Sequence, residues 1–323
     1  MKMDQAGQFA PTPESIQAIL TKYNLTLGQF EPAMSGIENT TLLVVALAQQ
    51  FVLRVYRHRR KSDAMIRREL AFIKYLAAAG LPTVPAIVNR AGQSYTRYGK
   101  WRAILMPFRP GYHPSHYTAA LVSQMAQTQA TMHQLAARFG RPPLWELPLF
   151  KLKETYFHQH IDRRQDLKPA VKDFLDRVKS FNYRLDHGLP KGYCHLDFSA
   201  GNVLVGGSGE LAAILDFDDL AHAPYVVCLG YTLWSLYQQE DPRLFAQYLE
   251  AYQAVRPLSQ VELASLPAVM LFRHYTVGAM KILEGTMDDQ KIGHYVRLES
   301  QLARECYTES LTCERTNYGS IHD

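Results

Sequence analysis

Residues 193–205 read Tyr-Cys-His-Leu-Asp-Phe-Ser-Ala-Gly-Asn-Val-Leu-Val, and fourteen residues after Asn202 comes Asp216, at the end of a second apolar run. The two apolar runs flank a glycine-rich turn at residues 206–209, which predicts a β-hairpin. Polar residues are confined to the loop before the first strand and to the end of the second. Such a hairpin can hold Asp197, Asn202 and Asp216 around one point.

These three side chains meet the needs of phosphoryl transfer. That reaction requires a carboxylate to orient an attacking hydroxyl and accept its proton, and hard oxygen ligands that hold Mg²⁺ against the phosphates. Asp197 suits the first role, and Asn202 and Asp216 suit the second. The pattern therefore predicts a phosphotransferase that uses Mg²⁺ and a nucleoside triphosphate.

The loop resembles that of the aminoglycoside phosphotransferase and choline kinase family, with the type II homoserine kinases as a narrower comparison. Small-molecule members of this family, which are relatives of the protein kinases, carry a His-x-Asp-x-x-x-x-Asn loop followed by an Asp at a strand end. His195, Asp197 and Asn202 match this loop, and Asp216 matches the later Asp. The chain departs from the family at Leu196, where many members have Gly. The resemblance implies that His195 orients the catalytic loop and does not act as the base.

An α+β, protein-kinase-like fold in two lobes is what this resemblance implies. A small lobe at residues 1–107, an antiparallel sheet with one packed helix, is expected to bind the nucleotide, and a larger, mostly helical lobe at residues 108–323 is expected to carry the catalytic loop and bind the acceptor. Apolar spacing agrees with this division. The expected strands lie at residues 29–34, 41–47, 51–56, 84–88 and 101–107, and the expected helices at residues 13–24, 63–79, 117–139, 169–185, 225–238, 242–255, 260–283 and 292–307.

The nucleotide-binding residues follow from the same resemblance. Arg54, on the third strand, takes the place of the Lys that pairs with the α and β phosphates in kinases, and Glu69, on the following helix, is its expected ion partner. An arginine fork can hold phosphate but is bulkier than Lys. The alternative is that Arg54 is a surface residue of the strand.

Two further segments are expected to contact ATP. Ser35 and Gly36 lie between the first two strands, where the family has its phosphate-covering loop, although a plain hairpin fits this segment as well. Met106 and Phe108 flank the link between the lobes, where backbone groups would meet adenine, and an ordinary linker is the alternative. The chain contains no Gly-x-x-x-x-Gly-Lys-Ser/Thr, which argues against a P-loop.

The charge of the chain is divided unevenly. Residues 1–110 contain 15 Lys+Arg and 6 Asp+Glu, whereas residues 111–323 contain 20 and 24. A basic half suits polyphosphate and an acidic half suits a cationic acceptor. The alternative for the basic residues of the segment 57–68 is a plain solvated face, and this is expected for most of the following: Arg57, Arg59, Arg60, Lys61, Arg67 and Arg68. The basic segment lacks the interleaved aromatics of a nucleic-acid site.

The sequence predicts neither a second metal site besides that for Mg²⁺ nor a membrane segment. Cys194, Cys228, Cys306 and Cys313 lack paired metal-ligand spacing and are interpreted as free thiols, and His133 as a structural residue. The sequence contains no apolar run long enough to cross a bilayer, and no signal peptide is recognised. A cytoplasmic protein is therefore expected.

The acceptor is expected to be a hydroxyl-bearing small molecule, an amino alcohol or hydroxy amino acid such as homoserine or choline. An aminoglycoside-type antibiotic phosphotransferase and a nucleotide-binding pseudokinase without turnover are the alternatives. Side chains considered for the acceptor pocket are acidic or aromatic: Asp218, Asp219, Tyr225, Tyr231, Trp234 and Tyr275. For the aromatic ones, packing in the core is the alternative.

Overall fold

A computed structural model of the 323-residue chain describes residues 9–33, 39–58, 61–141, 168–181, 185, 188–287 and 290–302. The chain divides into two compact units. We call the described residues of Met3–His116 and Ala200–Asp218 the sheet unit, and those of Tyr117–Ser199 and Asp219–Asp323 the helical unit. The stretch at residues 193–205 therefore contributes to both: Asp197 belongs to the helical unit, whereas Asn202 belongs to the sheet unit.

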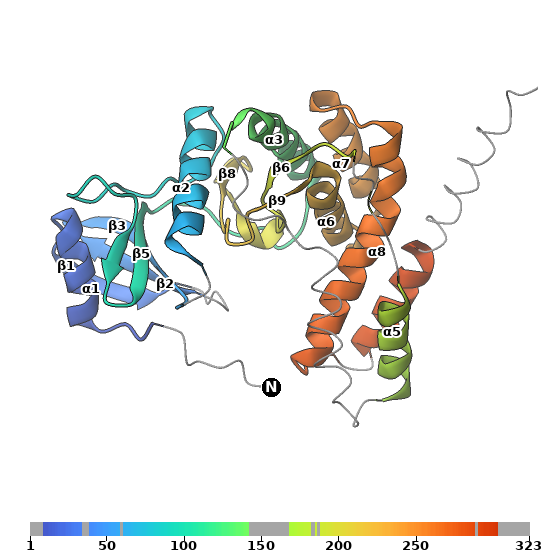
Figure 1. Ribbon diagram of the computed structural model, residues 1–323, viewed down its shortest axis with the longest axis horizontal. Coiled ribbons are helices and arrows are strands. Elements are labelled where there is room, and N and C mark those ends of the chain that lie inside the picture. The colour runs from blue at the N-terminus through green and yellow to red at the C-terminus, as the bar shows by residue number, and fades with distance from the viewer. Residues whose placement is uncertain are drawn as a thin grey trace, which may run out of the picture. The chain divides into compact units, whose positions relative to one another are not determined.

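The sheet unit contains a five-stranded antiparallel sheet in the order β1-β2-β3-β5-β4 (Figure 1). Helix α1 follows a capping box at Thr12, and helix α2 begins after an N-cap bond from Met65 N–H to the Ser62 hydroxyl. Together with the helical unit described below, this sheet confirms the predicted α+β fold class. The bounds are α1 Pro13–Leu20, β1 Leu27–Pro32, β2 Thr40–Ala46, β3 Gln49–Tyr56, α2 Asp63–Ala78, β4 Thr96–Tyr98 and β5 Trp101–Pro107.

The two faces of β3 differ in chemistry. Because side chains alternate along a strand, Phe51, Leu53 and Val55 share one face and are buried in an apolar core that includes residues of α1. Arg54 and Tyr56 occupy the other face, and the Tyr56 hydroxyl bonds Glu69 of α2. The strand thus carries a predicted phosphate-binding residue on the face away from its main apolar core.

One predicted strand is wrong. Residues 84–88 do not join the sheet as a strand, and the fifth strand is β4. Two prolines explain the difference: Pro82 and Pro85 have no N–H to donate to a ladder. The segment contacts the sheet through the Ile87 N–H, which donates to Leu105 O at 2.7 Å.

The predicted catalytic hairpin is present in the sheet unit. Strands β7 (Val203–Val205) and β8 (Leu211–Ile214) pair antiparallel. Beyond the last pair, the N–H of Leu215 donates to the carbonyl oxygen of Asn202 at 2.8 Å. The hairpin therefore brings the backbone of Asn202 beside the residue that precedes Asp216.

The helical unit consists of helices and one two-stranded ribbon, β6 (Lys191–Cys194) with β9 (Ala221–Pro224), of which β9 was not predicted. Helix α3 packs on α7, and α6 on α8. The helices are α3 Ala119–Arg138, α5 Pro169–Ser180, α6 Tyr225–Tyr237, α7 Pro242–Val255, α8 Gln260–Leu283 and a last helical stretch at residues 290–302. Helix α5 ends earlier than predicted, because Phe181 adopts an extended conformation. None of the helices described by the structure combines the length and hydropathy that a bilayer-spanning segment requires.

Candidate active site

A network of charged side chains lies between β3, α2 and the end of the hairpin in the sheet unit. Arg54 donates from Nη2 to Asp216 Oδ1 at 2.8 Å and to Asp218 Oδ2 at 2.7 Å. The Arg54 side chain is 13% exposed and that of Asp216 is 42% exposed. The structure therefore brings the predicted phosphate-binding arginine and the predicted metal-binding aspartate into one ion pair.

Lys61 is the second cation of this network. Its Nζ contacts Glu69 Oε2 and lies 3.1 Å from Asp218 Oδ1. The Lys61 side chain is 4% exposed, so Lys61 does not belong to the solvated face expected for most basic residues of this segment. Glu69 thus pairs with Lys61, whereas Arg54 pairs with the two aspartates, in place of the expected Arg54–Glu69 pair. The cation that pairs with Glu69 is therefore a lysine of the segment before α2, and not the arginine of β3.

A sequence signal for Lys61 existed. It directly precedes Ser62, the N-cap of α2, and cations are disfavoured at the positive end of a helix. A nearby acidic partner would offset this penalty, and Glu69 supplies one eight residues later.

Tyr56 and Asn39 complete the network. Tyr56 donates its hydroxyl hydrogen to Glu69 Oε1 at 2.8 Å, and Asn39 bonds Asp218 while accepting the Arg57 N–H at 2.9 Å. Both were missed from the sequence. Asp218, considered above for the acceptor pocket, is held inside this network.

Burial governs the protonation of these groups. Burial raises the pKa of Glu69, and Lys61 partly offsets this rise by favouring the carboxylate. Burial also raises the pKa of Tyr56 well above its usual value, as does the nearby Glu69. For Arg54, burial disfavours the charge, but Asp218 and Asp216 outweigh it and raise the pKa, so the guanidinium stays protonated. Arg54 is thus a permanent cation of the network, whereas burial works against the ionised form of Glu69.

The network fits an anionic ligand together with a divalent cation. Arg54 Nε is buried and has no hydrogen-bond partner among the described residues, which leaves a donor for a phosphate oxygen. With all groups ionised, three carboxylates face two cations, an excess of one negative charge that a metal cation would offset. The candidate ligands, the amide of Asn202 and the carboxylate of Asp216, are hard oxygen donors that suit Mg²⁺.

The remaining predicted nucleotide contacts are spread along the chain. Met106 pairs with Val52 at the end of β5, and Phe108, 38% exposed, donates its N–H to Gln50 O at 3.3 Å. Ser35 and Gly36 lie outside the described residues.

In the helical unit, Asp197 is the predicted catalytic base. Its side chain is 41% exposed and accepts a hydrogen bond from Arg273 Nη2 of α8 at 3.2 Å. His195 is fully buried, and its Nδ1 accepts the Asp197 N–H at 3.3 Å. This contact fits the expected orienting role. Leu196, between them, has φ +62°, a left-handed conformation in which Gly is unstrained. A Gly at this position, as the family resemblance implies, would meet that geometry without strain.

Arg273 was missed from the sequence, although a lone arginine in an apolar helix is a signal, because buried charges need partners. Its guanidinium lies 4.6 Å from the Tyr231 ring centre and 5.9 Å from that of Trp234. Burial raises the pKa of Tyr231 to about 12; Arg273 lowers it and Asp219 raises it. Tyr231 therefore lies near both an arginine and a carboxylate.

The aromatic residues considered for the acceptor are all buried, and Tyr231 and Trp234 are each 8% exposed. Tyr225 is 3% exposed and stacks on His133, and Tyr275 is 7% exposed and donates to Glu299 Oε1 at 2.8 Å. Their packing alternative fits the structure better than an acceptor contact.

Comparisons with known proteins agree with this architecture. The model of the phosphotransferase enzyme family matches residues 29–262. A homoserine kinase of Caulobacter vibrioides (strain NA1000 / CB15N) is 26% identical over 263 residues, covering 79% of this chain and 82% of its own.

Two solved structures share the fold. An amicoumacin kinase in complex with AMP-PNP and Ca²⁺ superposes with a TM-score of 0.70 at 16% identity, over 92% of this chain and 94% of its own. A microcompartment-associated aminopropanol kinase superposes with a TM-score of 0.63 at 18% identity, over 93% of this chain and 98% of its own. These likenesses bear out the protein-kinase-like fold. Since the family model covers well over half of the sequence, the chain belongs to the phosphotransferase enzyme family.

Proposed function

We propose that this protein transfers the γ-phosphoryl group of ATP to the hydroxyl group of a small hydroxy amino acid, with homoserine as the first candidate acceptor. The observation that carries the choice of acceptor is Arg273, whose guanidinium lies 3.2 Å from Asp197. An arginine fork is suited to a carboxylate. Choline, ethanolamine and aminopropanol have no carboxylate, whereas a hydroxy amino acid has one.

The surroundings of Arg273 support a zwitterionic acceptor. Arg273 lies over Tyr231, and the carboxylate of Asp219 influences the same tyrosine. An arginine over an aromatic ring, with a carboxylate whose charge acts on the same tyrosine, suits the carboxylate and the ammonium of an amino acid. The expected cationic character of the acceptor is then met by its ammonium group. The homoserine kinases among the relatives agree with this choice.

In this proposal Asp197 orients the acceptor hydroxyl and takes its proton as the oxygen attacks the γ-phosphorus and ADP leaves. The backbone contact of His195 holds the loop that carries Asp197. The positioning of Asp197 and the charges of the sheet unit supply most of the rate enhancement.

We assign the nucleotide to the N-terminal lobe, residues 1–107, and catalysis to residues 108–323. Asn202 and Asp216 are the proposed Mg²⁺ ligands, and the ion would offset negative charge on the phosphates when bound. Arg54 and the Lys61–Glu69 pair share the role of orienting the phosphates: Lys61 supplies the compact charge that the strand arginine cannot.

Ser35, Gly36, Met106 and Phe108 remain proposed ATP contacts. For the first two the proposal rests on their place between the first two strands, and for the others on their place at the link between the lobes.

An acceptor panel tests the proposal. The purified chain would be incubated with Mg-ATP and, separately, L-homoserine, ethanolamine, choline, aminopropanol or an aminoglycoside, and phosphorylated product measured by mass spectrometry. We expect kcat/KM for homoserine to exceed that for the amino alcohols by about 10- to 100-fold, since a charge-assisted hydrogen bond contributes about 1.5–3 kcal/mol. A preference for an amino alcohol or an aminoglycoside would overturn the acceptor assignment. If Mg-ATP raises the Tm of the chain but no acceptor is phosphorylated, the pseudokinase alternative would be favoured.

A further inference from the structure

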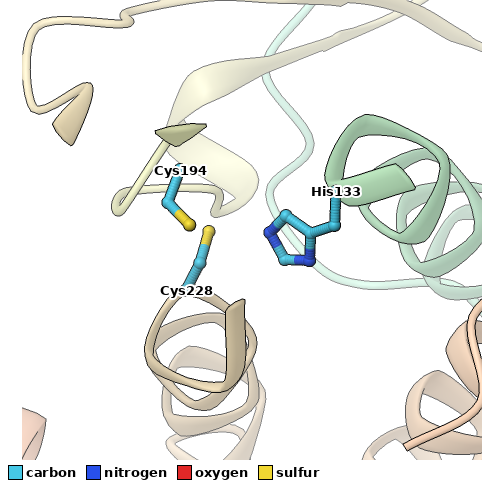
Figure 2. Close-up of side chains that lie close together, drawn as sticks. All are labelled: His133, Cys194 and Cys228. Carbon is cyan, nitrogen blue, oxygen red and sulfur yellow. The ribbon is translucent and has the colours of Figure 1, made fainter. Parts of the chain in front are cut away.

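Three potential metal ligands that the proposed reaction does not use meet in the core of the helical unit. Cys194 ends β6, Cys228 lies on α6 and His133 lies on α3. All three are fully buried, and their ligand atoms lie within 4.8 Å of one another. Figure 2 shows the two thiols and the imidazole ring turned toward one another from three separate elements.

The imidazole has one ring nitrogen committed and one available. His133 Nδ1 lies 2.7 Å from the Tyr252 hydroxyl. Its Nε2 is buried and makes no hydrogen bond of normal geometry among the described residues. Buried polar atoms are rarely left unpaired in proteins, so such an atom calls for an explanation. A bound ion between the ring and the thiols would supply one.

The two thiols differ in proton affinity. Burial raises the pKa of Cys194 well above its usual value. Burial opposes ionisation of Cys228 as well, but hydrogen bonding from Cys194 and the neighbouring His133 lower its pKa well below that value. The Gln129 amide, 3.5 Å from the Cys228 sulfur, is a further donor to a thiolate.

We propose that Cys194, Cys228 and His133 bind a thiophilic metal ion, with Cu⁺ favoured over Zn²⁺. Thiolate and imidazole donors select these soft or borderline ions over Mg²⁺ and Ca²⁺. Structural zinc takes four protein ligands, and among the described residues no fourth His, Cys, Asp or Glu joins this group. With one thiolate and one thiol, Cu⁺ gives a site without net charge. Zn²⁺ reaches the same neutrality by displacing the second thiol proton to solvent.

Outer contacts would hold the ligands in place. With Nε2 on the metal, the Nδ1–H of His133 donates to the Tyr252 oxygen, which also accepts from Arg256 Nη1 at 3.3 Å. Cys194 immediately precedes His195 and stands three residues before Asp197. The ion would therefore fasten the strand that leads into the catalytic loop to α3 and α6.

Metal binding to the full chain tests this proposal. The reduced, metal-stripped protein would be loaded under anaerobic conditions with Cu⁺ alone or Zn²⁺ alone and desalted. Bound metal is measured by mass spectrometry, thiolate-to-metal absorbance in the ultraviolet, and Tm by calorimetry. We expect one equivalent of metal per chain, with a raised Tm, because a ligand that binds only the native state stabilises it. Retention of Cu⁺ supports three-coordinate binding, and retention of Zn²⁺ alone supports the site but overturns the preference for Cu⁺.

Variants locate the ion. Cys194→Ala and Cys228→Ala should each lose the bound equivalent, whereas the double variant Cys306→Ser/Cys313→Ser, which removes the other two thiols of the chain, should retain it. If the core variants do not fold, metal binding by the Cys306→Ser/Cys313→Ser variant still tests whether the ion binds without these two thiols. Less than about a tenth of an equivalent of either metal on the unmodified chain would overturn the proposal. Loss of metal in the Cys306→Ser/Cys313→Ser variant would do the same.

Discussion

The two units present different chemistry to their predicted ligands. The sheet unit gathers Arg54, Lys61, Glu69, Asp216 and Asp218 into one ion-pair network, with Lys61 and Glu69 almost fully buried. In the helical unit the predicted site offers the ion pair of Asp197 with Arg273, whose side chains are 41% and 22% exposed. The surroundings of this pair include the Tyr231 ring beneath Arg273 and the buried His195.

This difference matches the tasks that we propose. A triphosphate with its metal carries a high charge, and preorganised charges in a dry environment stabilise it most strongly. The acceptor must instead be oriented, and its hydroxyl deprotonated only as the reaction proceeds. The sheet unit is built for charge and the helical unit for position, and each prediction below tests one side of this contrast.

The largest effect is expected at the catalytic base. Asp197→Asn keeps the shape of the side chain but removes its ability to accept a proton, so kcat should fall by about 10²- to 10⁴-fold. The KM for ATP should stay nearly constant. Steady-state kinetics with homoserine measures both, and an unchanged Tm confirms folding. A kcat within a few fold of the unmodified enzyme would remove Asp197 from the chemistry.

The next effect concerns the stability of the sheet unit. Lys61→Met leaves Glu69 and Asp218 without their buried cation, and breaking a buried ion pair on one side costs about 3–5 kcal/mol. Urea unfolding should show this loss in the free energy of unfolding. Lys74→Met, at an exposed position of α2, should change it by less than about 0.5 kcal/mol. Equal stability of the two variants would show that the network is not held as described.

Acid should weaken the helical unit through His274. Burial lowers the pKa of this histidine to about 4, while Trp234 Nε1 donates to its Nδ1 at 3.3 Å and its Nε2 lies 2.9 Å from Tyr295 O. The folded pKa is below the unfolded value, so the unfolded chain binds the proton more tightly. The contribution of neutral His274 to the free energy of unfolding is fully present above about pH 6.5. It is lost as the pH falls toward 4, by up to about 3 kcal/mol.

The measurement is urea unfolding at several pH values. His274→Gln should show a shallower decline over this window, because other groups then account for all of it. Parallel pH profiles for the two proteins would contradict the assignment to His274.

A smaller, selective effect is expected for the acceptor. Arg273→Met should raise the KM for homoserine by about 10- to 100-fold, the loss of one charge-assisted hydrogen bond. Turnover of ethanolamine should be unaffected or improved, because ethanolamine has no carboxylate to lose. Arg243→Met, a variant of an 89% exposed arginine, serves as the control. Equal losses on both acceptors would mean that Arg273 does not read a carboxylate.

The smallest effect compares two leucines with left-handed backbones. Leu196 has φ +62° and is 4% exposed, whereas Leu47 has φ +48° in the β2–β3 turn and is 69% exposed. Leu47→Gly relieves strain without losing burial and should stabilise by roughly 0.5–1 kcal/mol. Leu196→Gly also loses a buried side chain and should destabilise by about 1 kcal/mol. Chemical denaturation measures both, and a stabilising Leu196→Gly would show that packing there matters less than strain.

Local patterns predicted most of the fold because apolar spacing and turn residues act over a few positions. Strand β7 and helices α7 and α8 lie where the sequence placed them, and the hairpin brings Asn202 beside Leu215. The strand predicted at residues 84–88 does not form, because Pro85 and the nearby Pro82 cannot donate to a sheet ladder.

The ion partners of the site were harder to predict, because they depend on contacts between distant segments. Lys61 reaches Asp218 across 157 positions, and Arg273 reaches Asp197 across 76. The same reason explains why no metal cluster was predicted at Cys194, Cys228 and His133. Sequence spacing cannot reveal ligands that come from a strand and two helices.

The division of labour between the units is tested most directly by one two-substrate kinetic experiment on Lys61→Met and Arg273→Met, in which ATP and homoserine are varied independently. Lys61→Met should raise the KM for ATP and leave the KM for homoserine nearly unchanged, and Arg273→Met should do the reverse. If both variants alter the same constant, or if homoserine is not a substrate of the unmodified enzyme, the account given for the two units is wrong.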